Sequence, residues 1–224
     1  MTPAVGFAAG TAVDDEIASL TRLTIGLDVS RRFRADGFVR LDGLWSDALA
    51  DALEAEALAR EAAALWPASA PGPDSVRSRH RAPARQVTVD AAPLLAGLHG
   101  ALARLARVLS TRVVAPSVGN YGYYEDDDAC YLHVDVNDAD VTFLTTVAGR
   151  IGPLHLHPEL VGRAPAELHA LEADPRWDRQ SGQRLAYPRH GVAAIRGRDL
   201  PHHRPGTSVT GPTIVAALQY GARF

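Results

Sequence analysis

A series of short β-rich runs after Thr111 constrains the fold of this 224-residue chain more than any other feature. The runs cover residues 118–124, 129–136, 140–147, 154–157, 191–195 and 213–220, and Gly, Pro and Asp residues separate them. The chain before them has helical periodicity instead. Helix-like material followed by a strand series predicts a compact, mainly β barrel or sandwich with supporting helices packed outside it.

The first half of the chain supplies those helices. Residues 1–29 show little periodicity, and we expect them to be partly disordered. A short helix from Ser30 should stop at Gly37, and a short strand should follow over 38–41. Ser46 is a suitable N-cap for a helix over 47–65, and residues 93–109 carry leucines at the spacing of a buried helix face. We therefore predict a single domain, with a helical support region at 30–115 and a β core at 116–224.

Composition excludes several classes of protein. Hydrophobic residues make up 46% and charged residues 22% of the chain, as in an ordinary globular protein. The net charge of -3 gives no reason to expect nucleic acid or a membrane surface as a partner. The chain shows no targeting signal and no apolar run of the roughly 20 residues that a membrane span requires. The single cysteine, Cys130, is compatible with a reducing compartment, so we expect a cytoplasmic protein.

The run Tyr131-Leu132-His133-Val134-Asp135 carries the first sign of chemistry. Side chains alternate between the faces of a strand, so His133 and Asp135 should point the same way, together with Tyr131. Such a pair supplies two ligands of a 2-His-1-carboxylate triad, the arrangement that holds non-haem Fe(II) and leaves positions open. A second histidine must come from far along the chain, and His202 and His203 are both candidates. In a strand these two would face opposite ways.

Two other polar clusters have alternative readings. His155 and His157 form a His-x-His pair of the kind that cupins use for a metal, but Glu159 follows too closely to act as the cupin glutamate. One of these histidines should instead line the cavity or cover the barrel exterior. The acidic run at 125–128 matches no known calcium loop, and we interpret it as a solvated turn.

The order of these pieces resembles a known superfamily. Residues 116–224 are similar to the double-stranded β-helix (jelly-roll) core of Fe(II)- and 2-oxoglutarate-dependent dioxygenases, and residues 30–65 resemble the start of the phytanoyl-CoA hydroxylase-like branch. The resemblance, which extends to prolyl hydroxylases, is carried by His133-x-Asp135, the segments 152–158 and 191–195, the distal histidine and the closing strand from Thr213.

The resemblance implies a function and a set of ligands. It implies that Fe(II) and 2-oxoglutarate serve as cofactors and that the protein uses O2 to oxidise, most simply to hydroxylate, a small molecule, as in a biosynthetic tailoring pathway. Related halogenases lack the carboxylate, which Asp135 supplies here. In the family, a characteristic spacing separates the distal histidine from a later Gly-Pro pair. Counting back by that spacing from Gly211 and Pro212 favours His203 over His202 as the distal ligand. The implied catalytic and metal-binding set is His133, Asp135 and His203.

One position departs from the family's pattern. Thr213 stands where the family has the arginine that binds the far carboxylate of 2-oxoglutarate. A buried carboxylate without a strong donor is costly, so another residue must replace that arginine. Candidates for cofactor binding are Arg196 and Arg204, with hydrogen bonds from Tyr131 and Thr213. Further candidates are Arg198, Arg150 and the arginines of the loop at 77–85. The alternatives are an iron oxygenase that needs no 2-oxoglutarate and a non-catalytic barrel that binds a ligand.

Overall fold

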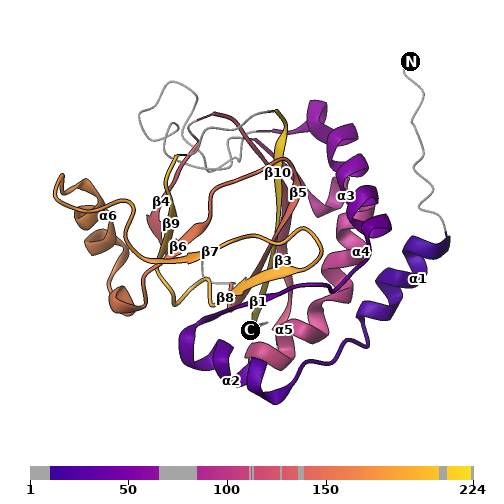
Figure 1. The fold of residues 1–224 in the computed structure, drawn as a ribbon, viewed down its shortest axis with the longest axis horizontal. Coiled ribbons are helices and arrows are strands. Elements are labelled where there is room, and N and C mark those ends of the chain that lie inside the picture. The colour runs from indigo at the N-terminus through magenta and orange to yellow at the C-terminus, as the bar shows by residue number, and fades with distance from the viewer. Residues whose placement is uncertain are drawn as a thin grey trace.

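Two antiparallel sheets that face each other form the centre of the molecule (Figure 1). The computed structural model describes residues 11–65, 85–110, 112, 114–126, 128–135, 139–206 and 211–222. The large sheet has, in spatial order, β1 (Phe38–Leu41), β8 (Val192–Ile195), β5 (Val141–Ala148), β10 (Thr213–Ala222), β3 (Val114–Tyr124) and β2 (Arg85–Thr88). The small sheet has β4 (Cys130–His133), β9 (His202–Arg204), β6 (Leu154–Leu156) and β7 (Gln183–Leu185).

Helices cover the outer face of the large sheet. They are α1 (Thr11–Leu20), α2 (Leu27–Asp36), α3 (Asp47–Arg60), α4 (Pro93–Ala101) and α5 (Ala103–Ser110), with short 3-10 turns at Glu61–Ala63 and Val89–Ala91. In Figure 1, α3 and α4 run along the side of β3 and β10 that faces away from the small sheet. A 3-10 turn (Pro158–Leu160) and α6 (Pro165–Ala173) form an insertion at the opposite end of the molecule.

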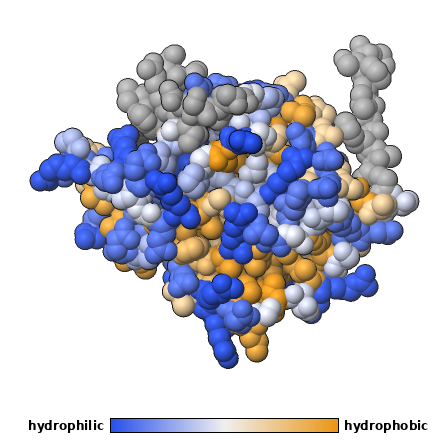
Figure 2. Space-filling model, viewed as in Figure 1, coloured by the Kyte–Doolittle hydropathy of each residue, from blue (hydrophilic) through white to orange (hydrophobic). Residues whose placement is uncertain are grey.

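The two sheets and the helices enclose two hydrophobic cores. The larger core lies between the helices and the large sheet and includes Phe33, Leu49 and Phe143. The smaller core lies between the sheets, and its buried residues are Leu154, Leu156, Leu185, Ala193, Ile195 and Leu200. Apolar side chains therefore line part of the space between the two sheets. On the face shown in Figure 2, hydrophilic residues dominate the end that carries α6.

A buried carboxylate ties the helical layer together. Helix α4 begins after Ala92, which has no capping side chain, and Glu56 of α3 takes over that role. Its carboxylate accepts hydrogen bonds from the backbone N–H groups of Leu94 at 2.8 Å and Leu95 at 3.0 Å, and from the Tyr121 hydroxyl at 2.9 Å. Glu56 is only 5% exposed, so α3, α4 and β3 meet at one charged group.

The predicted fold class is confirmed: the chain is a double-stranded β-helix with supporting helices. The expected helix before Gly37, the strand β1 and the Ser46 cap are also present, and Ser46 accepts a hydrogen bond from the Leu49 N–H. Among the described helices, none is long and apolar enough to cross a bilayer.

Other details differ from the sequence-based expectation. Residues 11–20 form a helix where we predicted partial disorder, because Ile17 packs against α4 and the Glu16 carboxylate accepts hydrogen bonds from Ser46. The helix expected over 93–109 is two helices with a turn at Leu102, in a segment that Gly97 and Gly100 weaken. Residues 1–10 and all of the arginine-rich loop except Arg85 lie outside the described ranges.

Candidate metal centre

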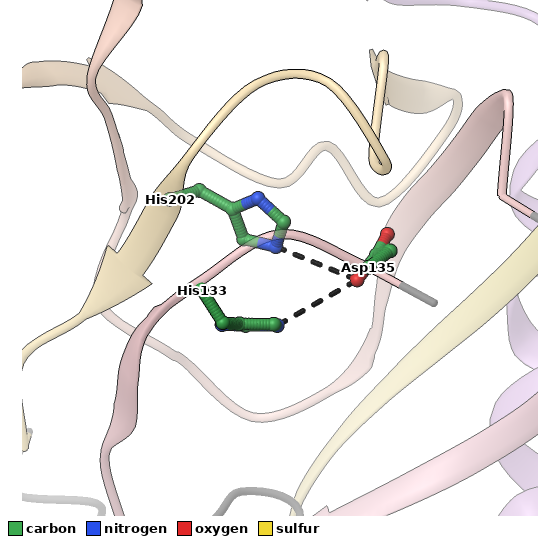
Figure 3. Close-up of side chains that lie close together, drawn as sticks. All are labelled: His133, Asp135 and His202. Atoms are coloured by element: carbon green, nitrogen blue, oxygen red, sulfur yellow. Dashed lines mark ion pairs between the residues drawn. The ribbon is translucent and has the colours of Figure 1, made fainter. Parts of the chain in front are cut away.

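Three side chains converge between the sheets, at His133, Asp135 and His202 (Figure 3). The Nε2 atoms of His133 and His202 each lie 3.6 Å from Oδ1 of Asp135. The two imidazole rings are tilted by 57°, with centroids 4.4 Å apart. Each residue offers one ligand atom, and these atoms lie within 4.8 Å of one another. Two neutral nitrogens and one carboxylate around a common point match the donor set of a non-haem Fe(II) site.

Strand pairing brings the two histidines together. β4 and β9 are antiparallel neighbours in the small sheet, and His133 lies directly opposite His202. Directly opposed residues project from the same face of a sheet, which here is the face toward the barrel interior. Asp135 follows just past the end of β4, where its backbone N–H donates to the Gly197 carbonyl at 2.8 Å. The long separation in sequence is therefore closed by one pair of short strands.

Backbone carbonyls fix the orientation of both imidazoles. Nδ1–H of His133 donates to the Tyr131 carbonyl at 2.7 Å, and Nδ1–H of His202 donates to the Leu200 carbonyl at 2.9 Å. A carbonyl can only accept, so each ring carries a proton on Nδ1, and in the neutral imidazole the Nε2 lone pair is directed toward Asp135. This is the arrangement by which proteins prepare histidines as metal ligands.

The carboxylate is held in the same way. The Thr142 hydroxyl on β5 donates to Oδ2 of Asp135 at 2.6 Å, so that Oδ1 faces the histidines. A Cβ at Gly197 would collide with Oδ2, which makes glycine necessary at this position. Burial raises the pKa of Asp135, but its interactions with His133 and His202 lower it by more, and the net pKa lies below its usual range. The group is therefore an ionised carboxylate.

The structure corrects the predicted third ligand. His203 points to the opposite face of β9 from His202, as alternation along a strand requires, so it cannot join His133 and Asp135. Its Nε2–H donates to the Arg179 carbonyl at 2.9 Å, and its Nδ1 lies 3.0 Å from Nε2 of His157. Counting from Gly211 gave a position one residue too late in the chain. His202, and not His203, lies beside His133 and Asp135.

The outward face of the small sheet carries a separate histidine cluster. His155 pairs across the strands with His203, and the Trp177 ring lies 4.7 Å from the His203 ring. His155, like His203, hydrogen bonds to a carbonyl of the insertion, that of Ser181 at 2.7 Å. Burial, together with the neighbouring histidines, lowers the pKa of His203 to about 4, so this ring is neutral at ordinary pH. His155 and His157 thus cover the barrel exterior, one of the two positions that the sequence allowed.

The other predicted cofactor-binding residues occupy different surroundings. The Tyr131 ring lies between the rings of His133 and His169, with centroid distances of 5.6 and 5.3 Å, on the side of α6. Arg196 packs its guanidinium against Gly37 outside the barrel. Thr213 opens β10 and is buried, and Arg204 follows His202 by two residues on β9, also buried. Of these candidates, Thr213 and Arg204 are the two that lie in the interior.

Sequence reasoning did not identify Thr142 and Gly197. Both act on Asp135 through the tertiary fold, Thr142 from the neighbouring sheet and Gly197 from the loop before β9. An isolated threonine in a strand and a glycine in a loop carry no local signal of a metal site. Gly197 could have been suspected only from its place shortly before the distal histidine.

Comparison with known proteins gives the class of fold. No known protein-family profile matches the sequence, and no curated protein matches it. The non-heme alpha ketoglutarate dependent carbocyclase SnoK from nogalamycin biosynthesis is 15% identical, with a TM-score of 0.66 over 88% of this chain and 84% of that one. HygX from Streptomyces hygroscopicus, solved with iron bound, is 13% identical, with a TM-score of 0.65 over 90% of this chain and 88% of that one.

A third similar structure was solved with a bound peptide. The prolyl hydroxylase of Trichoplax adhaerens, solved with a hypoxia inducible factor peptide, is 11% identical, with a TM-score of 0.64 over 94% of this chain and 93% of that one. The chain therefore has the fold of the Fe(II)/2-oxoglutarate oxygenases, as its motif order predicted.

Proposed function

We propose that this protein is a non-haem Fe(II) oxygenase that uses 2-oxoglutarate and O2 to oxidise a small molecule. The observation that carries the proposal is the convergence of His133 Nε2, His202 Nε2 and Asp135 Oδ1, with both Nδ1 atoms already committed to backbone carbonyls. The donor set fits Fe(II), and an ion held by these three residues would supply further positions for a 2-oxo acid and O2. The printed descriptions of similar folds support this choice of cofactors, since HygX was also solved with nickel and 2-oxoglutarate.

Each residue of the site has a distinct role in the proposed reaction. His133, Asp135 and His202 hold the iron, which when bound supplies the oxidation of a C–H bond coupled to oxidative decarboxylation of the 2-oxo acid. Thr142 keeps Asp135 oriented, and the apolar residues between the sheets exclude water from the reacting groups. Asp135 fills the position that a halide would need, which favours hydroxylation or a related oxidation over halogenation. A tailoring role in biosynthesis is supported by SnoK and SnoN, both described as acting in nogalamycin biosynthesis.

Anaerobic Fe(II) titration with and without 2-oxoglutarate tests the proposal. The wild-type protein should bind one Fe(II) and develop a visible metal-to-ligand charge-transfer band only when 2-oxoglutarate is added. Iron uptake without any response to 2-oxoglutarate would indicate an iron oxygenase that does not use 2-oxoglutarate. Absence of iron uptake would indicate a non-catalytic ligand-binding barrel.

Two adjacent histidines provide a matched pair of variants. His202→Ala should lose Fe(II) binding by at least about 100-fold, because it removes one of three protein ligands. His203→Ala removes the same side chain from the next residue but on the other face of the strand, and it should keep iron binding within about threefold. His133→Ala and Asp135→Ala should behave as His202→Ala does. Equal iron affinity in His202→Ala and wild type would refute the ligand set.

A further inference from the structure

Arg204 is the charged residue nearest in sequence to the distal ligand on the inner face of β9. Strand alternation places its side chain on the same face as His202, and it lies opposite Cys130 as His202 lies opposite His133. Two residues along a strand span about 6–7 Å, so the side chain begins one step away from the metal centre. Its position is therefore within the barrel and not on its surface.

The guanidinium is buried and incompletely satisfied. Arg204 is 2% exposed, its Nη2 donates a long hydrogen bond of 3.3 Å to the Asp128 carbonyl, and its Nε has no partner. Within the described part of the chain, no carboxylate forms an ion pair with it. A buried cation without an anionic partner costs several kcal/mol, on the order expected for an uncompensated charge. The barrel thus holds a buried cation for which the described residues supply no anionic partner.

Two tyrosines line the same site. The Arg204 guanidinium carbon lies 4.1 Å from the centroid of the Tyr124 ring. Burial raises the pKa of the Tyr124 and Tyr187 hydroxyls, and the neighbouring Arg204 cation only partly offsets this effect. Both hydroxyls therefore remain neutral and can donate a proton to an anion. One fork of N–H groups and two phenols make a recognition site for a carboxylate.

The Arg204 guanidinium extends toward Thr213, the residue at the start of β10 that stands where the similar family has an arginine. Thr213 is the cross-strand partner of Tyr124, and both project into the barrel. Arg204 stacks on Tyr124, so it reaches from the small sheet across the interior toward Thr213 on the large sheet.

We propose that Arg204, with the hydroxyls of Tyr124 and Tyr187, binds the second carboxylate of a dicarboxylic 2-oxo acid whose other end chelates the metal. This inference rests on the proposed function and adds the residue that sets cosubstrate specificity. It assigns the anchor to the strand that carries the distal histidine. It also implies that 2-oxoglutarate is preferred over a monocarboxylic acid of the same chain length, such as 2-oxopentanoate.

Binding of 2-oxoglutarate to Arg204→Met and to Arg196→Met tests the proposal. Both arginines carry a buried Nε without a partner, but Arg196 lies outside the barrel, so the two variants are matched. In calorimetric titrations of anaerobic protein loaded with Fe(II), Arg204→Met should raise the Kd for 2-oxoglutarate by about 100-fold, the typical loss for a buried charge-assisted pair. Arg196→Met should change it by less than about threefold. Fe(II) affinity should be the same in wild type and both variants.

Further measurements separate this inference from the proposed function. In Arg204→Met, the preference for 2-oxoglutarate over 2-oxopentanoate should disappear, whereas Arg204→Lys should recover part of the 2-oxoglutarate affinity. If wild type binds neither Fe(II) nor 2-oxoglutarate, the proposed function itself fails. If wild type binds both and Arg204→Met binds 2-oxoglutarate with unchanged Kd, only the assignment of Arg204 is overturned. A loss of Fe(II) binding in Arg204→Met would also overturn it, because the effect would then be on the metal centre.

Discussion

Asp135 shows how the geometry of the candidate metal centre depends on the orientation of one carboxylate. Its Oδ1 faces both histidines because Oδ2 is occupied by the Thr142 hydroxyl. The ordering of the carboxylate is therefore completed before any ion binds. A ligand that is already ordered loses less conformational entropy when a metal ion binds.

Thr142→Val should weaken Fe(II) binding by about 10–100-fold while the fold persists, because valine keeps the shape but removes the hydrogen bond that orients Asp135. Anaerobic Fe(II) titration measures the change. Thr145→Val is the matched control, since this threonine is also buried on β5 but donates to the Pro188 carbonyl at 2.8 Å instead. Equal iron affinity in Thr142→Val and wild type would contradict the orienting role.

At the scale of elements, the candidate site depends on the short strands β4 and β9. The helices α3, α4 and α5 support these strands indirectly, through the large sheet. β4 and β9 are only four and three residues long, and such strands have little stability of their own. The large sheet gives them a rigid partner, and α3, α4 and α5 give that sheet its buried outer face. The network at Glu56 joins two of these helices to β3.

Glu56→Ala should destabilise the protein by about 3 kcal/mol, because it leaves the N–H groups of Leu94 and Leu95 and the Tyr121 hydroxyl without a buried partner. Urea unfolding followed by circular dichroism measures this free energy. Glu54→Ala, on the same helix but at a more exposed position, should cost less than about 1 kcal/mol. A similar loss in both variants would mean that Glu56 acts only through helix propensity.

At the scale of the whole molecule, the insertion between β6 and β7 covers the outer face of the small sheet. Trp177 and the carbonyls of Arg179 and Ser181 contact His155 and His203. The metal centre and this cluster lie on opposite faces of the same strand, so β9 connects the barrel interior to the insertion. The stability of the molecule should therefore respond to protonation of His203.

The free energy of unfolding should fall as pH is lowered from about 6.5 toward 4. His203 has a folded pKa of about 4, below the ordinary histidine value of 6.5, so the unfolded chain binds more protons in this interval. The contribution is fully present above the unfolded pKa, and about 1–2 kcal/mol should be lost, allowing for solvent screening. Urea unfolding of metal-free protein across this pH range measures the loss.

The matching variants identify the responsible group. His203→Gln should flatten the pH dependence between pH 4 and 6.5, the range set by its folded and ordinary pKa values. His169→Gln, which changes an exposed histidine of α6, should leave the slope as in wild type. The assignment to His203 fails if the slope survives in His203→Gln.

The sequence by itself predicted the strand series and the common direction of the His133 and Asp135 side chains. These features are local, because alternation along a strand and turn residues between strands act within a few positions. The helix at 11–20 escaped prediction because its burial comes from contacts with α3 and α4. The short strands β7 and β9 were also not separated from the loops around them, since three residues carry no period.

Only the tertiary structure decided between His202 and His203 and brought Arg204 to Tyr124. The two neighbouring histidines cannot be told apart by residue type. The choice depends on which of them pairs with His133 across β4 and β9 and so faces the barrel interior, which is a matter of strand register. The burial of Arg204, with no carboxylate partner among the described residues, is likewise invisible in a linear chain, because it follows from the packing of two sheets. Local patterns define which strands form, and long-range pairing defines which side chains meet.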